Sequence, residues 1–201
     1  MRYDSLIFDI DGTLWDSRSL VAQGYNRQLA EEGLERFSVT VDQLKGLFGK
    51  VLPEIADILF GELPEPERAP LIYRCTASQD RLLHESPCKV GYPRVRETLE
   101  ALAKDHRLFI VSNSEQGYPE LCMEKLGLSD LFEDHLCFGD THTPKGRTIR
   151  TMIERHGLQS PAYIGDTQGD YEATVDAGIP ITSDRSSRSD VRKYYSNFTS
   201  S

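Results

Sequence analysis

The stretch Leu6-Ile7-Phe8-Asp9-Ile10-Asp11-Gly12-Thr13-Leu14 decides the fold, because an apolar run passes directly into two carboxylates one residue apart. The apolar run is typical of a buried strand. Alternate side chains of a strand point the same way, so Asp9 and Asp11 can flank one ligand while a backbone carbonyl beside them meets a cation. Gly12 then allows a sharp turn without the steric cost of a Cβ atom. The pattern predicts a strand end that carries a pair of carboxylates.

Three later segments also place polar groups where an apolar, strand-like run ends. Ser112 and Asn113 supply hydroxyl and amide groups that can hold phosphate oxygens. Lys145 stands just ahead of a helical pattern, so its ammonium group and the helix N-terminus can face one anion. Asp166 and Asp170 form a second pair of carboxylates. In open α/β sheets the ligand crevice lies beyond the carboxyl ends of the strands, and all these groups are expected there.

These motifs, in this order, make the chain resemble the haloacid dehalogenase superfamily of phosphohydrolases. The similarity extends to Asp16-Ser17, to Gly91-Tyr92-Pro93 and to Ala177-Gly178-Ile179-Pro180, and it covers nearly the whole chain as far as about Thr182. Within the superfamily the chain is similar to the helical-cap branch that includes phosphoglycolate phosphatase and β-phosphoglucomutase. Because Asp11 is present, phosphate-ester chemistry is favoured over dehalogenation.

The order of elements predicts an α/β fold with a Rossmann-like parallel sheet core and an inserted helical-bundle cap domain. Strand-like runs at 5–9, 107–112, 136–138, 163–165 and 179–182 alternate with helical patterns. Residues 17–88 are far longer than an ordinary βα connection, and their apolar spacing is helical. Thr40-Val41-Asp42-Gln43 reads as a capping box at the start of one of these helices. The expected domains are therefore a catalytic core of 1–16 and 89–201 and a cap of 17–88, which the resemblance places over the crevice.

The resemblance implies a role for each motif residue. Asp9 is the nucleophile that forms an aspartyl-phosphate, which splits one difficult step into two easier ones. Asp11 is the general acid toward the leaving alcohol and then the base toward water, a switch that requires its pKa to lie near the working pH. Lys145 neutralises Asp9 and the transferring phosphoryl oxygens. Many relatives read Lys-Pro where this chain has Lys145-Gly146.

The resemblance also implies a Mg²⁺ cofactor. Mg²⁺ prefers octahedral oxygen ligation at about 2.1 Å with several waters retained. Asp9, the Asp11 carbonyl and Asp166 would supply oxygen ligands, with Asp170 behind them or as an outer ligand. Asp170 can also cap the helix that follows Gly169. The remaining phosphate-binding groups are expected from the side chains of Ser112 and Asn113 and from the backbone of Gly12 and Thr13.

Substrate selection is expected from the cap. In relatives a loop between its early helices enters the site, and Lys50 stands at about that place. Lys50 either binds a second charge on the substrate or is a solvated lysine. Trp15 lies beside the catalytic loop, where a packing role is favoured over stacking on the substrate.

Composition narrows the classes of partner and compartment. The formal net charge of -9 argues against nucleic acid and anionic membranes, and it favours a divalent cation in any site for a phosphorylated metabolite. No apolar stretch approaches the roughly 20 residues that span a bilayer.

The start of the chain enters a strand rather than a signal sequence, so a soluble cytoplasmic protein is expected. The expected oligomeric state is a monomer or a homodimer. The four cysteines lack zinc-site spacing and are interpreted as reduced structural thiols. Residues 183–201 are enriched in Ser and Arg, a composition typical of a frayed end.

The leading hypothesis is a Mg²⁺-dependent phosphatase acting on a phosphoglycolate-like compound, a sugar phosphate or a nucleotide monophosphate. A β-phosphoglucomutase-type phosphomutase is the first alternative, since Leu44-Lys45-Gly46 is similar to its cap segment. That branch usually carries a histidine shortly after the Asp-Ser pair, where this chain has Leu20 and Val21. A non-enzymatic phospho-acceptor switch is the second alternative. Its acceptor aspartate belongs on the third strand, whereas Asp9 follows the first.

Overall fold

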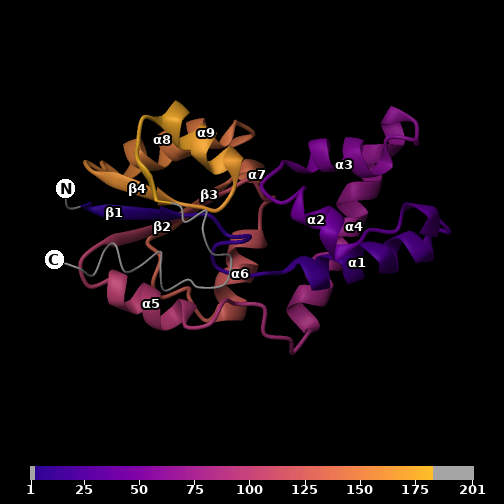
Figure 1. The fold of residues 1–201 in the computed structure, drawn as a ribbon, viewed down its shortest axis with the longest axis horizontal. Helices are drawn as coiled ribbons and strands as arrows, with labels where there is room; N and C mark the ends of the chain where they lie inside the picture. The colour runs from indigo at the N-terminus through magenta and orange to yellow at the C-terminus, as the bar shows by residue number, and fades with distance from the viewer. Residues whose placement is uncertain (1–2, 183–201) are drawn as a thin grey trace. The chain divides into compact units, whose positions relative to one another are not determined.

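The computed structural model describes residues 3–182, and the Ser- and Arg-enriched stretch 183–201 lies outside the described residues. The chain forms two compact units, which Figure 1 traces. The first consists of the residues up to Trp15 and from Gly91 onward, and the second is Asp16–Val90.

The first unit is built on a five-stranded parallel sheet with the strand order β3-β2-β1-β4-β5. Its strands are β1 (Ser5–Phe8), β2 (Arg107–Ser112), β3 (Asp134–Cys137), β4 (Pro161–Ile164) and β5 (Ile181–Thr182). Strand β1 is central: Ile7 is paired with Phe109 on one side and with Tyr163 on the other. Every residue of β1 and β4 is buried, as expected of a parallel sheet covered on both faces. The prediction of an α/β parallel sheet is confirmed.

The ends of four strands differ from the predicted ranges, and β1 ends at Phe8, one residue earlier than expected. Strands β3 and β4 each begin two residues earlier than expected, because backbone pairing continues past the apolar residues on which the prediction rested. In β3 the polar Asp134 and His135 pair with Phe109 and Ile110. Strand β5 covers only the last two residues of the predicted run 179–182. Pro180 precedes it and can accept a hydrogen bond from the Tyr163 N–H but has no N–H of its own to donate.

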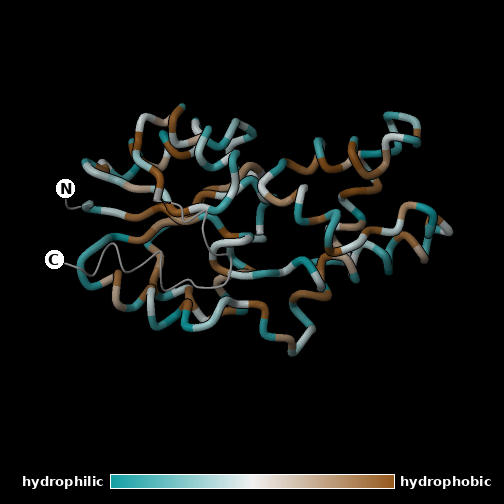
Figure 2. Tube along the Cα trace, in the orientation of Figure 1, coloured by the Kyte–Doolittle hydropathy of each residue, from teal (hydrophilic) through white to brown (hydrophobic). Residues whose placement is uncertain are grey.

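Helices cover both faces of this sheet. They are α5 (Val95–Leu102), α6 (Tyr118–Leu126), the short α7 (Phe138–Thr141), α8 (Lys145–His156) and α9 (Gln168–Ala177). Helices α8 and α9 lie on one face and α5 and α6 on the other (Figure 1). Ile149 and Met152 of α8 pack with Ile7, Phe109 and other strand residues in one buried cluster. The strands accordingly run through the most hydrophobic part of this unit in Figure 2.

The second unit is a helical bundle, as predicted. Its helices are α1 (Arg18–Glu31), α2 (Val41–Lys45), α3 (Leu52–Phe60) and α4 (Glu65–Glu85), with one 3-10 turn at Glu35–Phe37. Helices α1 and α4 cross closely at Gly24, where an added Cβ atom would lie 2.4 Å from the Gln79 Cα. Thr40 caps α2 in the predicted capping box with Gln43. The unit has its own apolar core, which includes Tyr25 and Phe60.

Two further sequence expectations concern thiols and membranes. All four cysteines are free thiols; Cys75, Cys122 and Cys137 are buried and Cys88 is exposed. Across residues 3–182, none of the helices combines the length and the apolar character that a bilayer span needs.

Candidate active site

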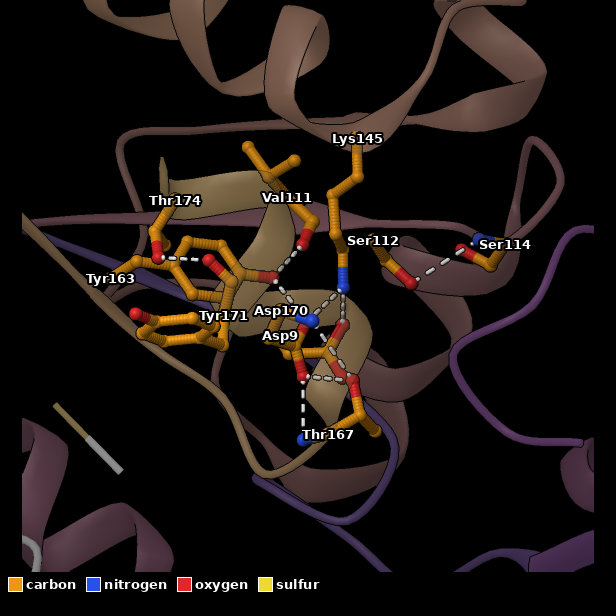
Figure 3. Close-up of polar contacts among 10 residues, drawn as sticks. All are labelled: Asp9, Val111, Ser112, Ser114, Lys145, Tyr163, Thr167, Asp170, Tyr171 and Thr174. Carbon is orange, nitrogen blue, oxygen red and sulfur yellow. Dashed lines mark hydrogen bonds and ion pairs between the residues drawn. The ribbon is translucent and has the colours of Figure 1, made fainter. Parts of the chain in front are cut away.

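The site is centred on Asp9, the first residue after β1. Its backbone N–H continues the sheet by donating to the Ile164 carbonyl, so its position is fixed by the central strand. Its side chain is buried, and its Oδ1 atom lies 2.7 Å from Lys145 Nζ. The same Nζ atom lies 2.6 Å from Asp170 Oδ1, and all three side chains are at least 95% buried (Figure 3). One ammonium group therefore bridges two carboxylates in the interior.

Lys145 reaches this position because α8 packs very closely against α9. Lys145 is the first residue of α8 and Gly146 the second. A Cβ atom on Gly146 would lie 2.4 Å from Asp176 Oδ2 and 2.9 Å from the Ala173 carbonyl oxygen. Only glycine fits this approach without movement. This explains the departure from Lys-Pro noted in the sequence.

Asp170 serves two purposes at once. Its Oδ2 atom accepts hydrogen bonds from the Thr167 N–H at 2.9 Å and the Thr167 hydroxyl at 2.7 Å, while the Thr167 hydroxyl accepts from the Asp170 N–H. This capping box begins α9. Its Oδ1 atom faces Lys145. Asp170 thus caps the helix, as the sequence allowed, and also binds the lysine.

Tyr163 supports the lysine and Asp170, and sequence reasoning missed it. Its hydroxyl donates to the Val111 carbonyl at 2.8 Å and lies 3.4 Å from Asp170 Oδ1, while Lys145 Nζ is 5.4 Å from the centroid of its ring. A tyrosine inside a fully buried strand needs a partner for its hydroxyl, and that was the signal available in the sequence.

Two carboxyl groups in this cluster compete for one ammonium group. Burial raises the pKa of Asp9, Lys145 opposes that effect, and Asp170 adds to it. Burial would also raise the pKa of Asp170, but Lys145 and Thr167 outweigh it and hold that pKa below its ordinary value. Burial alone would lower the pKa of Lys145, yet Asp170 and Asp9 raise it, so the lysine is charged. Two carboxylates share one ammonium group.

The carboxyl groups around Asp9 also offer ligands for a divalent cation. Asp9, Asp166 and Asp170 each offer a ligand atom, and these atoms lie within 4.8 Å of one another. Within residues 3–182, the buried Asp9 Oδ2 atom has no hydrogen-bond partner. The Asp166 carboxylate lies against Gly12, where an added Cβ atom would be 2.5 Å from both of its oxygens. Partial burial and the charge of Asp170 raise the pKa of Asp166 to about 6. Hard oxygen ligands of this kind suit Mg²⁺.

Asp11 is held by two aromatic side chains. Its Oδ1 atom accepts hydrogen bonds from Trp15 Nε1 and from the Tyr118 hydroxyl, both at 2.9 Å. Trp15 is fully buried, consistent with the predicted packing role, but it is also a hydrogen-bond donor. Tyr118 is the second residue that sequence reasoning missed. Nothing in its local pattern signals a contact with a residue 107 positions away.

The predicted phosphate-binding residues lie in two segments of the chain. The backbone N–H groups of Gly12 and Thr13 donate to the Trp15 and Ile10 carbonyls, so the structure engages within the loop the donors that were predicted for phosphate. The Thr13 hydroxyl is buried and, in the described part of the chain, has no partner. Ser112 is the last residue of β2, and its Oγ atom accepts a hydrogen bond from the Ser114 N–H at 3.2 Å (Figure 3). Asn113, the next residue along the chain, is half-buried.

Lys50 belongs to the helical unit rather than to the unit that carries Asp9. It precedes α3, and its Nζ atom lies 3.7 Å from Glu54 Oε2, with 41% of the side chain exposed. Its role in substrate selection stays a prediction.

Known proteins match this chain over most of its length. A family model described as haloacid dehalogenase-like hydrolase matches residues 6–183. The phosphoglycolate phosphatase of Agrobacterium fabrum is 33% identical over 185 residues, which cover 87% of this chain and 77% of that protein. The phosphoglycolate phosphatase of Aliivibrio fischeri is 30% identical over 189 residues, which cover 86% and 80%.

Solved structures share the fold. A haloacid dehalogenase-like family hydrolase from Streptococcus pneumoniae superposes with a TM-score of 0.78 at 18% identity, covering 98% of this chain and 91% of that one. A predicted phosphoglycolate phosphatase from Haemophilus somnus superposes with a TM-score of 0.77 at 23% identity, covering 90% and 84%. At these identities the likeness concerns the fold alone.

Proposed function

The chain belongs to the haloacid dehalogenase-like hydrolase family, and on that premise we propose that it is a Mg²⁺-dependent phosphatase that hydrolyses a small phosphorylated metabolite through an aspartyl-phosphate intermediate. The observation that carries the proposal is the arrangement around Asp9. Lys145 holds one carboxylate oxygen, and the other oxygen is buried with no partner in residues 3–182. A carboxylate fixed in this way is oriented for attack on phosphorus.

In the first step, Asp9 Oδ2 forms a bond to phosphorus as the bond to the leaving oxygen breaks. Lys145 keeps Asp9 in one orientation through Oδ1, and its ammonium group offsets the negative charge that gathers on the transferring phosphoryl oxygens. Asp170 Oδ1 binds the Lys145 ammonium group, and the Tyr163 ring lies beside it. Because these contacts fix the ammonium group, it needs no rearrangement during the reaction.

Asp11 transfers the protons. It gives one to the leaving oxygen in the first step, which releases an alcohol, and takes one from water in the second step. Water then forms a bond to phosphorus, the bond between phosphorus and Asp9 breaks, and inorganic phosphate leaves. The Thr13 hydroxyl, Ser112 and Asn113 are proposed to bind the phosphoryl oxygens.

Asp9, Asp166 and the Asp11 carbonyl would hold Mg²⁺. When bound, the cation neutralises the carboxylates and the phosphoryl oxygens and favours an in-line geometry. Asp170 would support these ligands without binding the cation directly, because Lys145 binds its Oδ1 atom and Thr167 binds its Oδ2 atom. The fit rests on the close spacing of the three carboxylates, whose ligand atoms lie within 4.8 Å of one another, because Asp9 Oδ2 is the atom that attacks phosphorus.

The names of the relatives suggest the first substrate to test. The relatives from Agrobacterium fabrum and Aliivibrio fischeri, both at least 30% identical to this chain, are named phosphoglycolate phosphatases, so 2-phosphoglycolate leads the candidates, followed by sugar phosphates and nucleotide monophosphates. In this proposal residues 1–16 and 89–201 form the catalytic core, and residues 17–88 act as a cap that selects the substrate, with Lys50 as a candidate contact.

The test is release of inorganic phosphate from a panel of these compounds, with Mg²⁺ or with excess chelator. Asp9→Asn should lower turnover by several orders of magnitude, because the covalent route disappears. Asp42→Asn, which changes an exposed aspartate of α2, is the matched control and should keep full turnover. Retention of more than a tenth of the unsubstituted turnover in Asp9→Asn would refute the nucleophile assignment. Full activity in chelator would remove the cation from the mechanism.

A further inference from the structure

We propose that Tyr118 and Trp15 are positioning residues for Asp11: together they bind its Oδ1 atom and so direct the proton that Asp11 transfers to Oδ2. This inference rests on the proposed function. It extends that function to two residues that belong to none of the sequence motifs.

The two donors converge on one oxygen from rigid surroundings. Trp15 Nε1 and the Tyr118 hydroxyl each lie 2.9 Å from Asp11 Oδ1. The side chain of Trp15 is fully buried, and only 7% of Tyr118 is exposed. Their rings meet edge to face, with centroids 5.4 Å apart, so each ring restricts the other.

The backbone fixes both rings as well. Trp15 forms bridge pairs with Asp11 and with Gly91, and the first of these closes the turn from Asp11 to Trp15. Tyr118 is the first residue of α6, and Gly117 before it adopts a φ of 86°, a left-handed conformation that favours glycine. The helix start therefore aims the tyrosine back toward the β1 loop. Neither donor can follow Asp11 to another rotamer without disturbing a buried ring.

Two donors on one oxygen decide which oxygen carries the proton. A carboxylate oxygen has about two acceptor sites, so two donors fill Oδ1. An indole N–H can only donate, and this one points at the same atom as the phenol. When Asp11 is protonated on Oδ2, Oδ1 is a carbonyl oxygen and still accepts both bonds. The same contacts therefore suit both protonation states.

This arrangement lets Asp11 act as acid and then as base without rotating. In the first step the Oδ2 proton passes to the leaving oxygen as its bond to phosphorus breaks and the bond from Asp9 forms. In the second step a proton passes from water to Oδ2 as the water oxygen bonds to phosphorus and the bond to Asp9 breaks. Asp11 ends protonated on Oδ2, as it began, and no further reactant is consumed.

The hydrogen bond between Tyr118 and Asp11 also connects the loop after β1 to the start of α6. Asp11 lies on the loop after β1, and Tyr118 begins α6 directly after the loop that follows Ser112 and carries Asn113. A displacement of α6 would move Tyr118 and thereby release Asp11. Tyr118 thus fixes the position of Asp11 relative to the proposed phosphate-binding loop.

The first test does not depend on activity. Trp15 is the only tryptophan of the chain, so its indole N–H gives a single NMR resonance. A bond to the carboxylate should shift that resonance downfield and slow its exchange with solvent. Asp11→Ala should move it upfield and speed its exchange, whereas Tyr171→Phe, which changes an exposed tyrosine of α9, should leave it in place. A resonance unmoved by Asp11→Ala would overturn the assignment.

The second test separates positioning from structural support. Tyr118→Phe should lower kcat for an alkyl phosphate about 10-fold, because a poor leaving group depends on general acid catalysis, worth about 10²- to 10⁴-fold. The KM value, and kcat for p-nitrophenyl phosphate, should change by less than about twofold, because an activated leaving group needs little protonation. In single turnovers of the alkyl ester, the double variant Tyr118→Phe with Asp11→Asn should be less than about twofold slower than Asp11→Asn alone. The effects of residues that act as a unit are not additive.

The outcomes distinguish this inference from the proposed function. Suppose that the unsubstituted protein releases phosphate and that this release depends on Asp9. If Tyr118→Phe then slows hydrolysis of both esters equally, or still slows the Asp11→Asn variant 10-fold, the positioning role is wrong and the proposed phosphatase activity stands. Without Asp9-dependent phosphate release, the proposed function is wrong and the positioning role falls with it. Trp15→Phe, checked by thermal melting, should reproduce the selective loss on the alkyl ester.

Discussion

Replacing Lys145 by methionine tests the central ion cluster, because methionine keeps most of the volume and removes the charge. The variant leaves Asp9 and Asp170 buried together with no ammonium group between them. Removing one partner of a buried ion pair costs about 3 to 5 kcal/mol of folding free energy. For a protein of this size each kcal/mol corresponds to about 2 to 4 °C in Tm, so we expect a loss of roughly 6 to 20 °C at neutral pH without metal.

The pH dependence of this loss has a definite sign. In the unsubstituted protein Asp170 has a lowered pKa, because Lys145 and Thr167 outweigh the effect of burial. Its contribution to stability is present above its ordinary value of 3.8 and is lost as the pH falls through the lowered pKa. In Lys145→Met the two carboxylates repel each other, so their pKa values rise and their ionisation opposes folding. The deficit should be largest at neutral pH and should shrink below about pH 4.

The assay is thermal or urea unfolding of the variant at pH 7.5 and pH 4, with and without Mg²⁺. A bound cation replaces part of the missing charge, so Mg²⁺ should stabilise the variant more than the unsubstituted protein. Turnover should fall by about 10²- to 10³-fold or more, comparable to the loss of a group that stabilises developing charge. Lys104→Met, at an exposed lysine, is the matched control. Stability within about 1 kcal/mol of the unsubstituted protein at both pH values would refute the reasoning, since the predicted cost is at least threefold larger.

Four further outcomes follow from particular contacts. Gly146→Ala should destabilise the protein by about 1 to 3 kcal/mol, because the new Cβ atom collides with Asp176. It should lower kcat by a larger factor than it changes KM. Kinetics equal to the unsubstituted protein would show that α8 can shift freely. Burial raises the pKa of Asp80 to about 6, above its unfolded value of 3.8, so its ionisation costs stability as the pH rises through that window. Asp80→Asn should therefore be more stable at pH 7.5, by about 1 to 2 kcal/mol after allowance for partial exposure, and the gain should vanish below pH 4; equal urea midpoints at both pH values in the two proteins would contradict this. Asp166→Ala should raise the Mg²⁺ concentration needed for half-maximal phosphate release, and Ca²⁺ should not substitute, because its larger and looser shell spoils in-line geometry; an unchanged Mg²⁺ requirement would remove Asp166 from the site. Lys50→Ala should raise KM for a substrate with a second charge and spare p-nitrophenyl phosphate, and equal changes for both would mean that Lys50 does not select the substrate.

The sequence predicted most of the groups that surround Asp9, because each of them lies in the connection after a strand or in the first turn of the helix that follows. The register of a parallel sheet brings strand ends to one edge, so the order of the motifs was enough to expect Lys145 and Asp170 near Asp9. Which atoms meet was not predictable in this way. That one ammonium group bridges both carboxylates depends on the close crossing of α8 and α9, and the sequence shows this only as an unexplained Gly146.

The residues that sequence reasoning missed are those whose partners lie far along the chain. Tyr118 contacts Asp11 across 107 positions, and Tyr163 donates to Val111 across 52. Both residues read as ordinary aromatic positions in their own segments, one at a helix start and one in a buried strand. Their hydroxyl groups find partners only after the sheet and α6 have assembled. Periodicity and capping rules describe neighbours in sequence, and so they cannot name such pairs.

The charge of the core site connects its structure to the order of events in catalysis. Asp9 and Asp170 are buried around one ammonium group, and Asp166 adds a third carboxylate nearby. A phosphate monoester dianion approaching these groups alone would meet net negative charge, within a chain whose formal charge is already -9. A divalent cation held by Asp9 and Asp166, as proposed above, would offset this negative charge. In the proposed mechanism the cation would therefore bind before the phosphorylated substrate or together with it, and the carboxylates that would repel the substrate alone would help to hold it through the cation.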